Sequence, residues 1–216
     1  MNIVRKELNI LAYHGTEHDL AMGIVSDTEF KKQYRENHWL GQGVYFFRED
    51  YKQAETWALF KMKAHKKTGK LAVIEKEIYV DRKNILNLNS REGMQYFKKF
   101  REALDQFLQE KNIEITTNKE DPHMLRCFYC DRLPKEVKVV EAIFEGDSKL
   151  NELDQLKDLE VKLKGIQVCV RDLDLINKQP IKIVLTKEVR NSYKKRDNRN
   201  KGNKQKTFEE SDLYET

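Results

Sequence analysis

Three short segments of this 216-residue sequence hold residue types that could do chemistry together. The segment Tyr13–Thr16 reads Tyr-His-Gly-Thr and follows an apolar run, which predicts a strand that stops at a turn. Gly15 has no side chain, so the backbone there can approach another group closely. The segment Leu40–Phe47 has two glycines before a β-branched and aromatic run, which indicates a loop entering a strand. The late apolar segment Ile166–Asp172 carries Gln167 and predicts another strand.

Each segment alone predicts little about function. A glycine after a strand is ordinary turn chemistry, and a lone His14 is more typical of a hydrogen-bonded turn histidine than of a ligand. The Gly-x-Gly loop of the second segment lacks the third glycine and the following helix of a dinucleotide-binding fingerprint. Tyr45, with an apolar neighbour on either side, is by itself typical of a core residue. The functional prediction depends on the order and spacing of the three segments.

A Cys-x-x-Cys pair at Cys127 and Cys130, with His123 upstream, raises the alternative of zinc or redox chemistry. No second Cys or His pair follows, and Cys169 lies in an apolar strand, so ordinary buried thiols are the favoured interpretation. A thioredoxin-type site needs the pair after a strand at a helix start, whereas this pair interrupts a helix-like segment after Pro122. We therefore predict no metal, and three thiols without a disulfide framework fit a reducing compartment.

The surrounding elements mix strands and helices without βαβ regularity, which predicts an α+β fold. Asp50 and Ser90 are typical helix N-caps, and the first helix is expected to run to about Lys66. The apolar stripe Met94–Leu108 on the second helix has 3- and 4-residue spacing and is predicted to pack in the core. A short helical face is expected around residues 20–25, and strands at 9–13, 44–47, 71–80, 139–144, 166–170 and 181–185.

The net charge of +5 is unevenly distributed along the chain. Residues 187–206 include nine Lys/Arg and two acids, residues 207–216 four acids and no base, so residues 1–186 carry +2. We therefore predict a globular domain at 1–186 and a tail at 187–216, which either binds nucleic acid by counterion release or is a solvated, disordered extension. No apolar run approaches the roughly 18 residues of a membrane span, and the N-terminus lacks a secretory pattern, which predicts a cytoplasmic protein without a membrane partner.

Taken together, the three segments resemble the His-Tyr-Glu clade of ADP-ribosyltransferases, which includes diphtheria toxin and the poly(ADP-ribose) polymerases. In that family a His-Gly-Ser/Thr on the first strand, a Gly-x-Tyr-Phe strand and a late-strand Glu form the pocket for NAD. The resemblance covers about Leu8 to Leu185, is close for the first two segments, and is greatest to small bacterial single-domain members. It implies a split β-sheet core with flanking helices and an NAD-dependent transferase.

The resemblance also implies roles for individual residues. His14 would hydrogen-bond a ribose hydroxyl of the adenosine half of NAD. Gly15 would offer its backbone N–H and C=O to the nicotinamide carboxamide, and Thr16 would contact the same group. Tyr45 would stack on the nicotinamide ring, and Trp57, on the helix after the Tyr strand, would be the second aromatic of the pocket. NAD is then a co-substrate, and no metal is implied.

Gln167 stands where the family has its glutamate. A carboxylate can accept from the reactive ribose 2′-OH and stabilise developing positive charge, whereas an amide can only accept. The change argues against polymer synthesis and for transfer of single ADP-ribose units. Alternatively, a carboxylate comes from Glu141, Glu145 or the substrate, or the chain has no activity.

The resulting prediction is a mono-ADP-ribosyltransferase that modifies a cytoplasmic protein or nucleic acid, as a bacterial toxin or phage-defence effector with an antitoxin or immunity partner. Two alternatives stay open. One is an RNA 2′-phosphotransferase, which also uses NAD on a related fold and also carries a His-Gly-Thr. The other is a module that binds NAD, ADP-ribose or RNA without chemistry, for which Gln167 is the best support.

Overall fold

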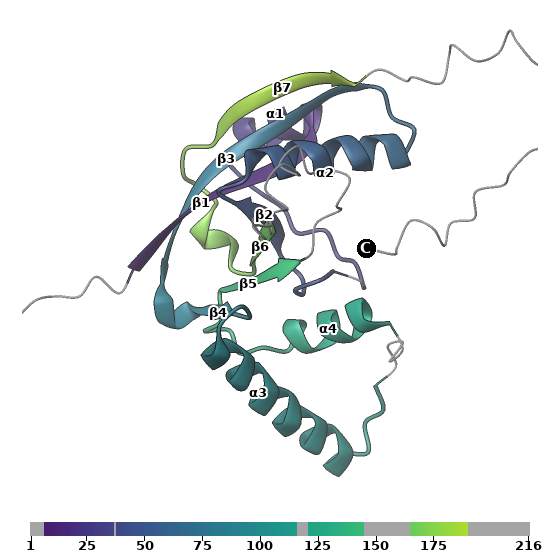
Figure 1. The fold of residues 1–216 in the computed structure, drawn as a ribbon, viewed down its shortest axis with the longest axis vertical. Coiled ribbons are helices and arrows are strands. Elements are labelled where there is room, and N and C mark those ends of the chain that lie inside the picture. Colours follow the sequence, from purple (N-terminus) through teal and green to yellow (C-terminus); the bar gives the residue numbers. More distant parts are fainter. Residues whose placement is uncertain (1–6, 37, 116–120, 145–164, 190–216) are drawn as a thin grey trace, which may run out of the picture.

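A seven-stranded mixed sheet forms the centre of the computed structural model, which describes residues 7–36, 38–115, 121–144 and 165–189 (Figure 1). Its strand order is β4-β5-β6-β2-β1-β3-β7, and only the β4–β5 pair is parallel. The strands are β1 (Glu7–Glu17), β2 (Val44–Arg48), β3 (Gly69–Asp81), β4 (Ile85–Asn87), β5 (Val139–Phe144), β6 (Gly165–Val170) and β7 (Lys182–Val189). The helices are α1 (His18–Asp27), α2 (Tyr51–Ala64), α3 (Arg91–Glu110) and α4 (Pro122–Asp131), with short 3₁₀ turns at Arg82–Asn84 and Leu173–Leu175.

The α+β class and most elements agree with the sequence pattern, and both predicted caps are present. The Asp50 carboxylate accepts from the Gln53 N–H at 2.9 Å, and the Ser90 hydroxyl accepts from the Gly93 N–H at 3.0 Å. The short strand β4 was not predicted. Its three residues are too few to show a period, and they are fixed by parallel pairing with β5.

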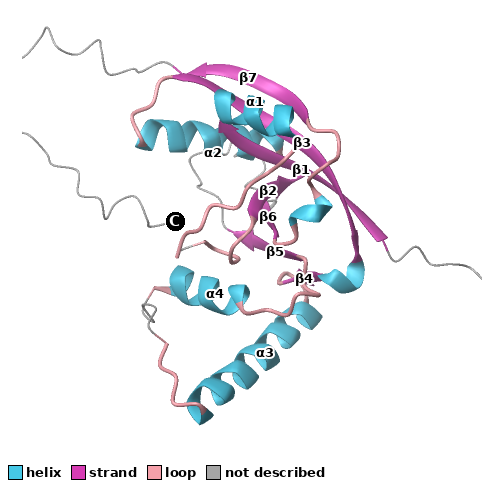
Figure 2. Ribbon diagram, turned by 180° about the vertical axis from the view of Figure 1, so that it is seen from behind, coloured by secondary structure: helices cyan, strands magenta, loops and turns pink. Residues whose placement is uncertain are grey.

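Two helices cover opposite faces of the sheet, as the front view in Figure 1 and the rear view in Figure 2 show for α2 and α1. On the α1 face, Ala21 packs in the largest buried cluster with Ile10 and Phe46. On the α2 face, Ala54 packs with Phe47 and Val73. Side chains alternate along each strand, so neighbouring positions of β2 belong to different cores.

The long strand β1 is held very differently on its two edges. Toward β3 it forms a continuous ladder of eleven paired positions, from Glu7↔Asp81 to Glu17↔Leu71. Toward β2 only Ala12↔Arg48 and Tyr13↔Phe47 are paired. The C-terminal half of β1 therefore keeps β3 as its neighbour while its other edge leaves the β2 ladder, and the sheet is split between residues 14–17 and 44–46.

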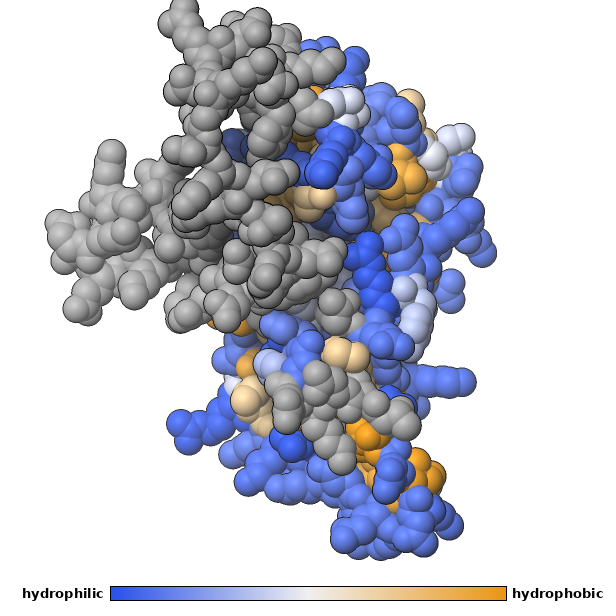
Figure 3. All heavy atoms as spheres, turned by 90° about the vertical axis from the view of Figure 1, so that its right-hand side faces the viewer, coloured by the Kyte–Doolittle hydropathy of each residue, from blue (hydrophilic) through white to orange (hydrophobic). Residues whose placement is uncertain are grey.

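Helices α3 and α4 form a separate pair beside β4 and β5, at the lower end of the molecule in Figure 1. The prediction that the α3 stripe lies in the core is only partly right. Leu108 is buried and Phe97 packs against a buried cluster, but Met94 and Phe107 are about half exposed. Figure 3 shows apolar surface at this lower end. The apolar stripe of α3 is longer than the surface that the short helix α4 covers, so part of the stripe stays exposed.

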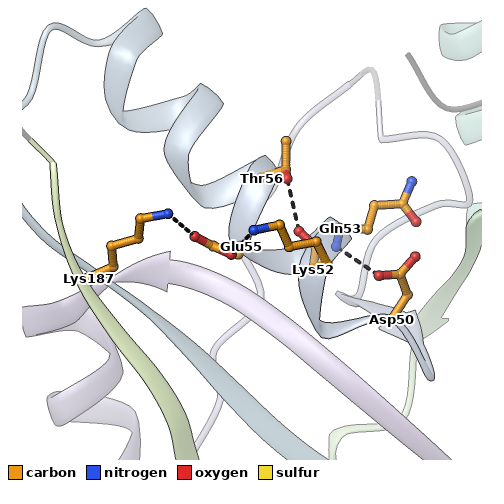
Figure 4. Close-up of polar contacts among 6 residues, drawn as sticks. All are labelled: Asp50, Lys52, Gln53, Glu55, Thr56 and Lys187. Atoms are coloured by element: carbon orange, nitrogen blue, oxygen red, sulfur yellow. Dashed lines mark hydrogen bonds and ion pairs between the residues drawn. The ribbon is translucent and has the colours of Figure 1, made fainter. Parts of the chain in front are cut away.

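The predicted domain boundary after residue 186 is too early. Lys187, Glu188 and Val189 belong to β7 and pair with Leu71, Lys70 and Gly69 of β3. Lys187 also reaches across to α2, where its ammonium lies 2.5 Å from the buried Glu55 carboxylate (Figure 4). Residues 190–216, the rest of the predicted tail, lie outside the described residues. Within the described part of the chain, no helix is long and apolar enough to cross a membrane.

Gly15 lies directly beneath α2. A Cβ at this position would overlap the backbone carbonyl of Ala54 and lie 3.1 Å from the Ala58 side chain. The close packing of α2 on β1 therefore requires glycine, because a helix backbone cannot move aside as the end of a flexible side chain can.

We expect Gly15→Ala to lower the free energy of unfolding by about 1–3 kcal/mol, because α2 must shift away from β1. Urea unfolding followed by circular dichroism measures this. Gly23→Ala in α1 is the matched control, since nothing lies within 4 Å of a Cβ there and alanine favours the helix by about 0.5–1 kcal/mol. Equal effects of the two substitutions would contradict the packing explanation.

Candidate functional site

The gap between β1 and β2 presents unpaired strand edges at the position of the first sequence segment. The Leu11 carbonyl accepts from the Glu49 N–H at 2.9 Å, so the backbone groups of odd-numbered β1 residues face β2. Gly15 follows the last pair, Tyr13↔Phe47, and in a continued ladder it would pair with Tyr45. Its N–H and C=O therefore point toward β2, beyond the last paired position of the ladder.

The His14 side chain bridges this gap. Its Nδ1 lies 2.8 Å from the Tyr45 backbone carbonyl, the group that a continued ladder would have given to Gly15. A carbonyl only accepts, so Nδ1 carries the proton and Nε2 of the neutral ring is an acceptor. Burial holds the pKa of His14 below its usual 6.5, and the charge of Lys61 lowers it further. The hydrogen bond to Tyr45 opposes this shift and raises the pKa.

The side-chain hydroxyl of Tyr45 makes two hydrogen bonds, one as acceptor and one as donor. The hydroxyl accepts from the Leu40 N–H and donates to the Gly41 carbonyl, each at 2.7 Å. Burial raises the pKa of this phenol, so it stays protonated and can donate. The ring is partly buried and lies 5.2 Å from the His38 ring at an angle of 60°. The loop of the second segment is thereby tied to the strand beside the gap.

Gln167 lies on the same face of the sheet as Tyr45. It pairs with Phe47 of β2, and Tyr45 pairs with Cys169 two residues further along β6. Such diagonal neighbours have Cα atoms about 7–8 Å apart in a regular antiparallel pair. The structure thus brings the second and third segments together as the sequence order suggested.

Trp57 belongs to a row on α2 that includes Gln53 and Lys61 at four-residue spacing. Gln53 lies against Gly165 of β6, and Lys61 is close enough to His14 to influence its titration. Figure 4 shows Gln53 on the flank of α2 away from Lys187. Trp57 lies between these two residues, on the flank toward the gap, and is 40% exposed. Thr16 is partly buried on β1 and pairs with Ala72.

Lys61 and Arg35 influence one another electrostatically, which the sequence analysis did not predict. Burial lowers the pKa of Lys61 and the charge of Arg35 lowers it further, while Glu17 acts in the opposite direction. Burial likewise lowers the pKa of His38, to which Arg35 adds and which Asp131 opposes, so this ring is favoured in its neutral form. The i, i+4 spacing from Trp57 to Lys61 could have indicated that the two residues share a side of the helix. Arg35 lies in an irregular loop, where the sequence has no periodic pattern to place it.

The loop that carries Arg35 and His38 is held by α4. The Gln42 N–H donates to the Asp131 carboxylate at 2.5 Å, and the Arg126 Nε–H donates to the Trp39 carbonyl at 2.8 Å. Gly41 has φ +84°, and a Cβ there would collide with the Asp131 side chain. The outlying helix pair thus supports one wall of the gap.

Glu141, an alternative source of the missing carboxylate, is separated by the sheet from the side chains of Tyr45 and Gln167. It pairs with Val168 on β6 and therefore lies on the face opposite Tyr45 and Gln167. Its buried carboxylate is 3.0 Å from the Arg48 guanidinium, an ion pair that gives it a structural role. Glu145, the other alternative, lies outside the described residues.

The three thiols are buried, and Cys127 and Cys130 lie within α4 rather than at a helix start. Burial raises the pKa of Cys127 to about 11 and that of Cys130 to about 12, which keeps both protonated and unreactive. Within the described ranges, no three His, Cys, Asp or Glu side chains are grouped as metal ligands would be.

Comparison with known proteins finds a partial relative but no family. The chain is 33% identical over 93 residues to an uncharacterized protein of Methanocaldococcus jannaschii, a match that covers 43% of this chain and 41% of the relative. The chain thus matches about two fifths of that protein's length. No family model and no solved structure matches the chain.

We expect the His14 imidazole to titrate below pH 6.5 and to keep its proton on Nδ1 when neutral, because burial disfavours the cation. A folded-state pKa below the unfolded value means that this residue's contribution to stability is present above about pH 6.5 and is lost as the pH falls through the folded pKa. Nitrogen-detected NMR of the histidine rings measures both properties. Titration of His14 at or above 6.5 would contradict this description.

Glu141→Gln tests the structural role of the buried ion pair. We expect it to lower the free energy of unfolding by roughly 1–3 kcal/mol, because Arg48 loses its charged partner. Thermal unfolding measures this effect. A variant as stable as the native protein would contradict a structural role for the pair.

Proposed function

We propose that this protein is an NAD-dependent mono-ADP-ribosyltransferase whose pocket is the gap between β1 and β2. The observation that carries the proposal is the end of the β1–β2 ladder at Tyr13↔Phe47, beyond which Gly15 and Tyr45 are not paired with each other. A primary carboxamide has one acceptor and two donor hydrogens, so it can bond to the N–H and C=O of one residue as a strand does.

In this proposal the nicotinamide end of NAD binds beside Gly15 and Tyr45. Gly15 would receive the carboxamide, with Thr16 beside it, and the Tyr45 ring would stack on the nicotinamide. Trp57, on the overlooking flank of α2, would cover the ring from the other side. This arrangement also explains why the Tyr45 hydroxyl is fixed to Leu40 and Gly41: a stacking ring acts best when it is already held in place.

The rest of the dinucleotide finds matching groups nearby. The free Nε2 of His14 can accept from a ribose hydroxyl, since Nδ1 is used by Tyr45. Lys61 and Arg35 provide positive charge for a pyrophosphate, and their mutual repulsion is relieved when an anion binds between them. The partly buried position of Lys61 strengthens this attraction, because burial reduces solvent screening.

NAD would supply an ADP-ribosyl group on a leaving group that departs as neutral nicotinamide. In the transfer the bond from ribose C1″ to the nicotinamide nitrogen breaks, a nucleophile of the acceptor bonds to C1″, and its proton passes to solvent. Tyr45 and Gly15 hold the leaving group flat while this happens. Gln167 can accept from the ribose 2′-OH but carries no charge, which fits transfer of a single unit.

Two other functions remain as alternatives, each with one observation in its favour. Gln167 in place of a carboxylate favours a module that binds NAD or ADP-ribose without chemistry. The cations Lys61 and Arg35 beside His14 favour an RNA 2′-phosphotransferase, which needs a basic set to hold the RNA phosphate. Release of nicotinamide without any 2′-phosphorylated RNA would exclude both. A role as a cytoplasmic toxin or phage-defence effector, with an antitoxin or immunity partner, belongs to the same proposal.

The direct test uses NAD labelled with ³²P on the adenylate phosphate, incubated with the protein and total cell lysate. We expect label in macromolecules, separated by extraction into protein and nucleic acid, and no label with His14→Ala. Unlabelled macromolecules and intact NAD with the native protein would overturn the transferase and leave the binding module.

Tyr45 provides a graded test of the pocket. Tyr45→Ala should reduce nicotinamide release by about tenfold to a hundredfold, because the stacking surface is lost. Tyr45→Phe keeps the ring but releases Leu40 and Gly41, so we expect a smaller loss, expressed in the Michaelis constant for NAD. Activity of Tyr45→Ala within twofold of the native protein would contradict the assignment.

A further inference from the structure

A stacked pair of exposed aromatic rings lies on α2, the helix that packs on Gly15. Trp57 is 40% exposed and Phe60 is 47% exposed, and their ring planes are 24° apart with centroids 6.1 Å from each other. Trp57 precedes Lys61 by one helical turn on the same side of α2. Phe60 is further out, and neither the sheet nor the NAD pocket requires an aromatic there.

The chain around this pair is strongly basic. Residues 51–70 contain six lysines and a single acid, Glu55, which is buried and neutralised by Lys52 and Lys187. Beyond the pair, Lys63 and Lys66 are exposed at the end of α2 and in the turn that follows. Arg35 adds a further cation from the facing loop, and Tyr34 beside it is 77% exposed.

This combination has a specific chemical meaning. Exposed aromatic faces bounded by cations fit a polyanion with flat rings, and a single-stranded nucleic acid has both features. A duplex would not fit, because its bases are stacked on each other and unavailable to Phe60. A protein partner is less well matched, since protein interfaces are depleted in lysine around their apolar centre.

We propose that α2 binds single-stranded nucleic acid as the acceptor, with a base stacked on Phe60 and the backbone phosphates contacted by Lys63 and Lys66. The acceptor role in this proposal rests on the proposed transferase function. Binding of nucleic acid to this surface does not depend on it. In the proposed reaction a nucleophile of a neighbouring nucleotide bonds to ribose C1″ and displaces nicotinamide, losing its proton to solvent.

The test is fluorescence anisotropy with a labelled 20-nucleotide oligouridine and the full-length protein. Phe60→Ala should weaken binding by about tenfold, the cost typical of losing one base–aromatic stack. Lys63→Ala with Lys66→Ala should also weaken binding and make it less dependent on salt, with the slope of log affinity against log salt smaller by about one to two.

Matched variants on α3 serve as controls. Phe107→Ala removes an equally exposed aromatic (49%), and Lys99→Ala removes an exposed lysine from the same helix. We expect both to bind like the native protein. Equal binding by Phe60→Ala and the native protein would overturn the proposal, because basic residues elsewhere would then account for the affinity.

Two further arms of the experiment separate the proposals. Repeating the titration with oligothymidine and with a duplex of the same length distinguishes RNA, single-stranded DNA and non-specific charge, and equal affinity for the duplex would contradict base stacking. Nicotinamide release that persists in Phe60→Ala, with label on nucleic acid reduced, supports both proposals. Label on protein alone would leave the transferase standing and remove the nucleic-acid acceptor.

Discussion

Backbone hydrogen bonding between β1 and β2 stops after Tyr13 and Phe47, and the candidate site depends on how the chain compensates for this. Two interactions are found where the pairing of β1 with β2 ends. Helix α2 packs so closely on Gly15 that no side chain is possible there, and His14 satisfies the Tyr45 carbonyl with its ring. Unpaired backbone groups are costly in a buried place, so an opening with this geometry favours a ligand that can pair with them.

The electrostatics of the site follow from the same arrangement. His14 is held neutral by burial, while Lys61 and Arg35 bring positive charge to the edge of the opening. The buried carboxylates nearby are neutralised within the fold, Glu141 by Arg48 and Glu55 by lysines of α2 and β7. Glu17 is likewise paired with Lys67, so the acids of this region are largely balanced by neighbouring lysines and arginine.

The sequence was sufficient for the class of fold, the caps at Asp50 and Ser90, and the three segments that meet in space. These depend on local periods and on the order of motifs, which a single sequence contains. The sequence was insufficient to predict the positions of Lys61 and Arg35 or the sheet face on which Glu141 lies. These depend on strand register and on packing between elements that are distant in the sequence. Alternation along β5 fixes where Glu141 lies only after its pairing with Val168 is known. The exposure of the α3 stripe likewise depends on how much of it the short helix α4 covers.

The most direct test of the account follows the Gly15 amide by ¹⁵N–¹H NMR as nicotinamide, and then NAD, is added to the full chain. If the gap between β1 and β2 is the pocket, the Gly15 amide proton shifts downfield as it bonds to the carboxamide. The signal of Tyr45 moves with it, while Gly23 on the far side of β1 stays in place. A titration that leaves Gly15 unmoved, or that shifts only residues of α3 and α4, would contradict the central claim.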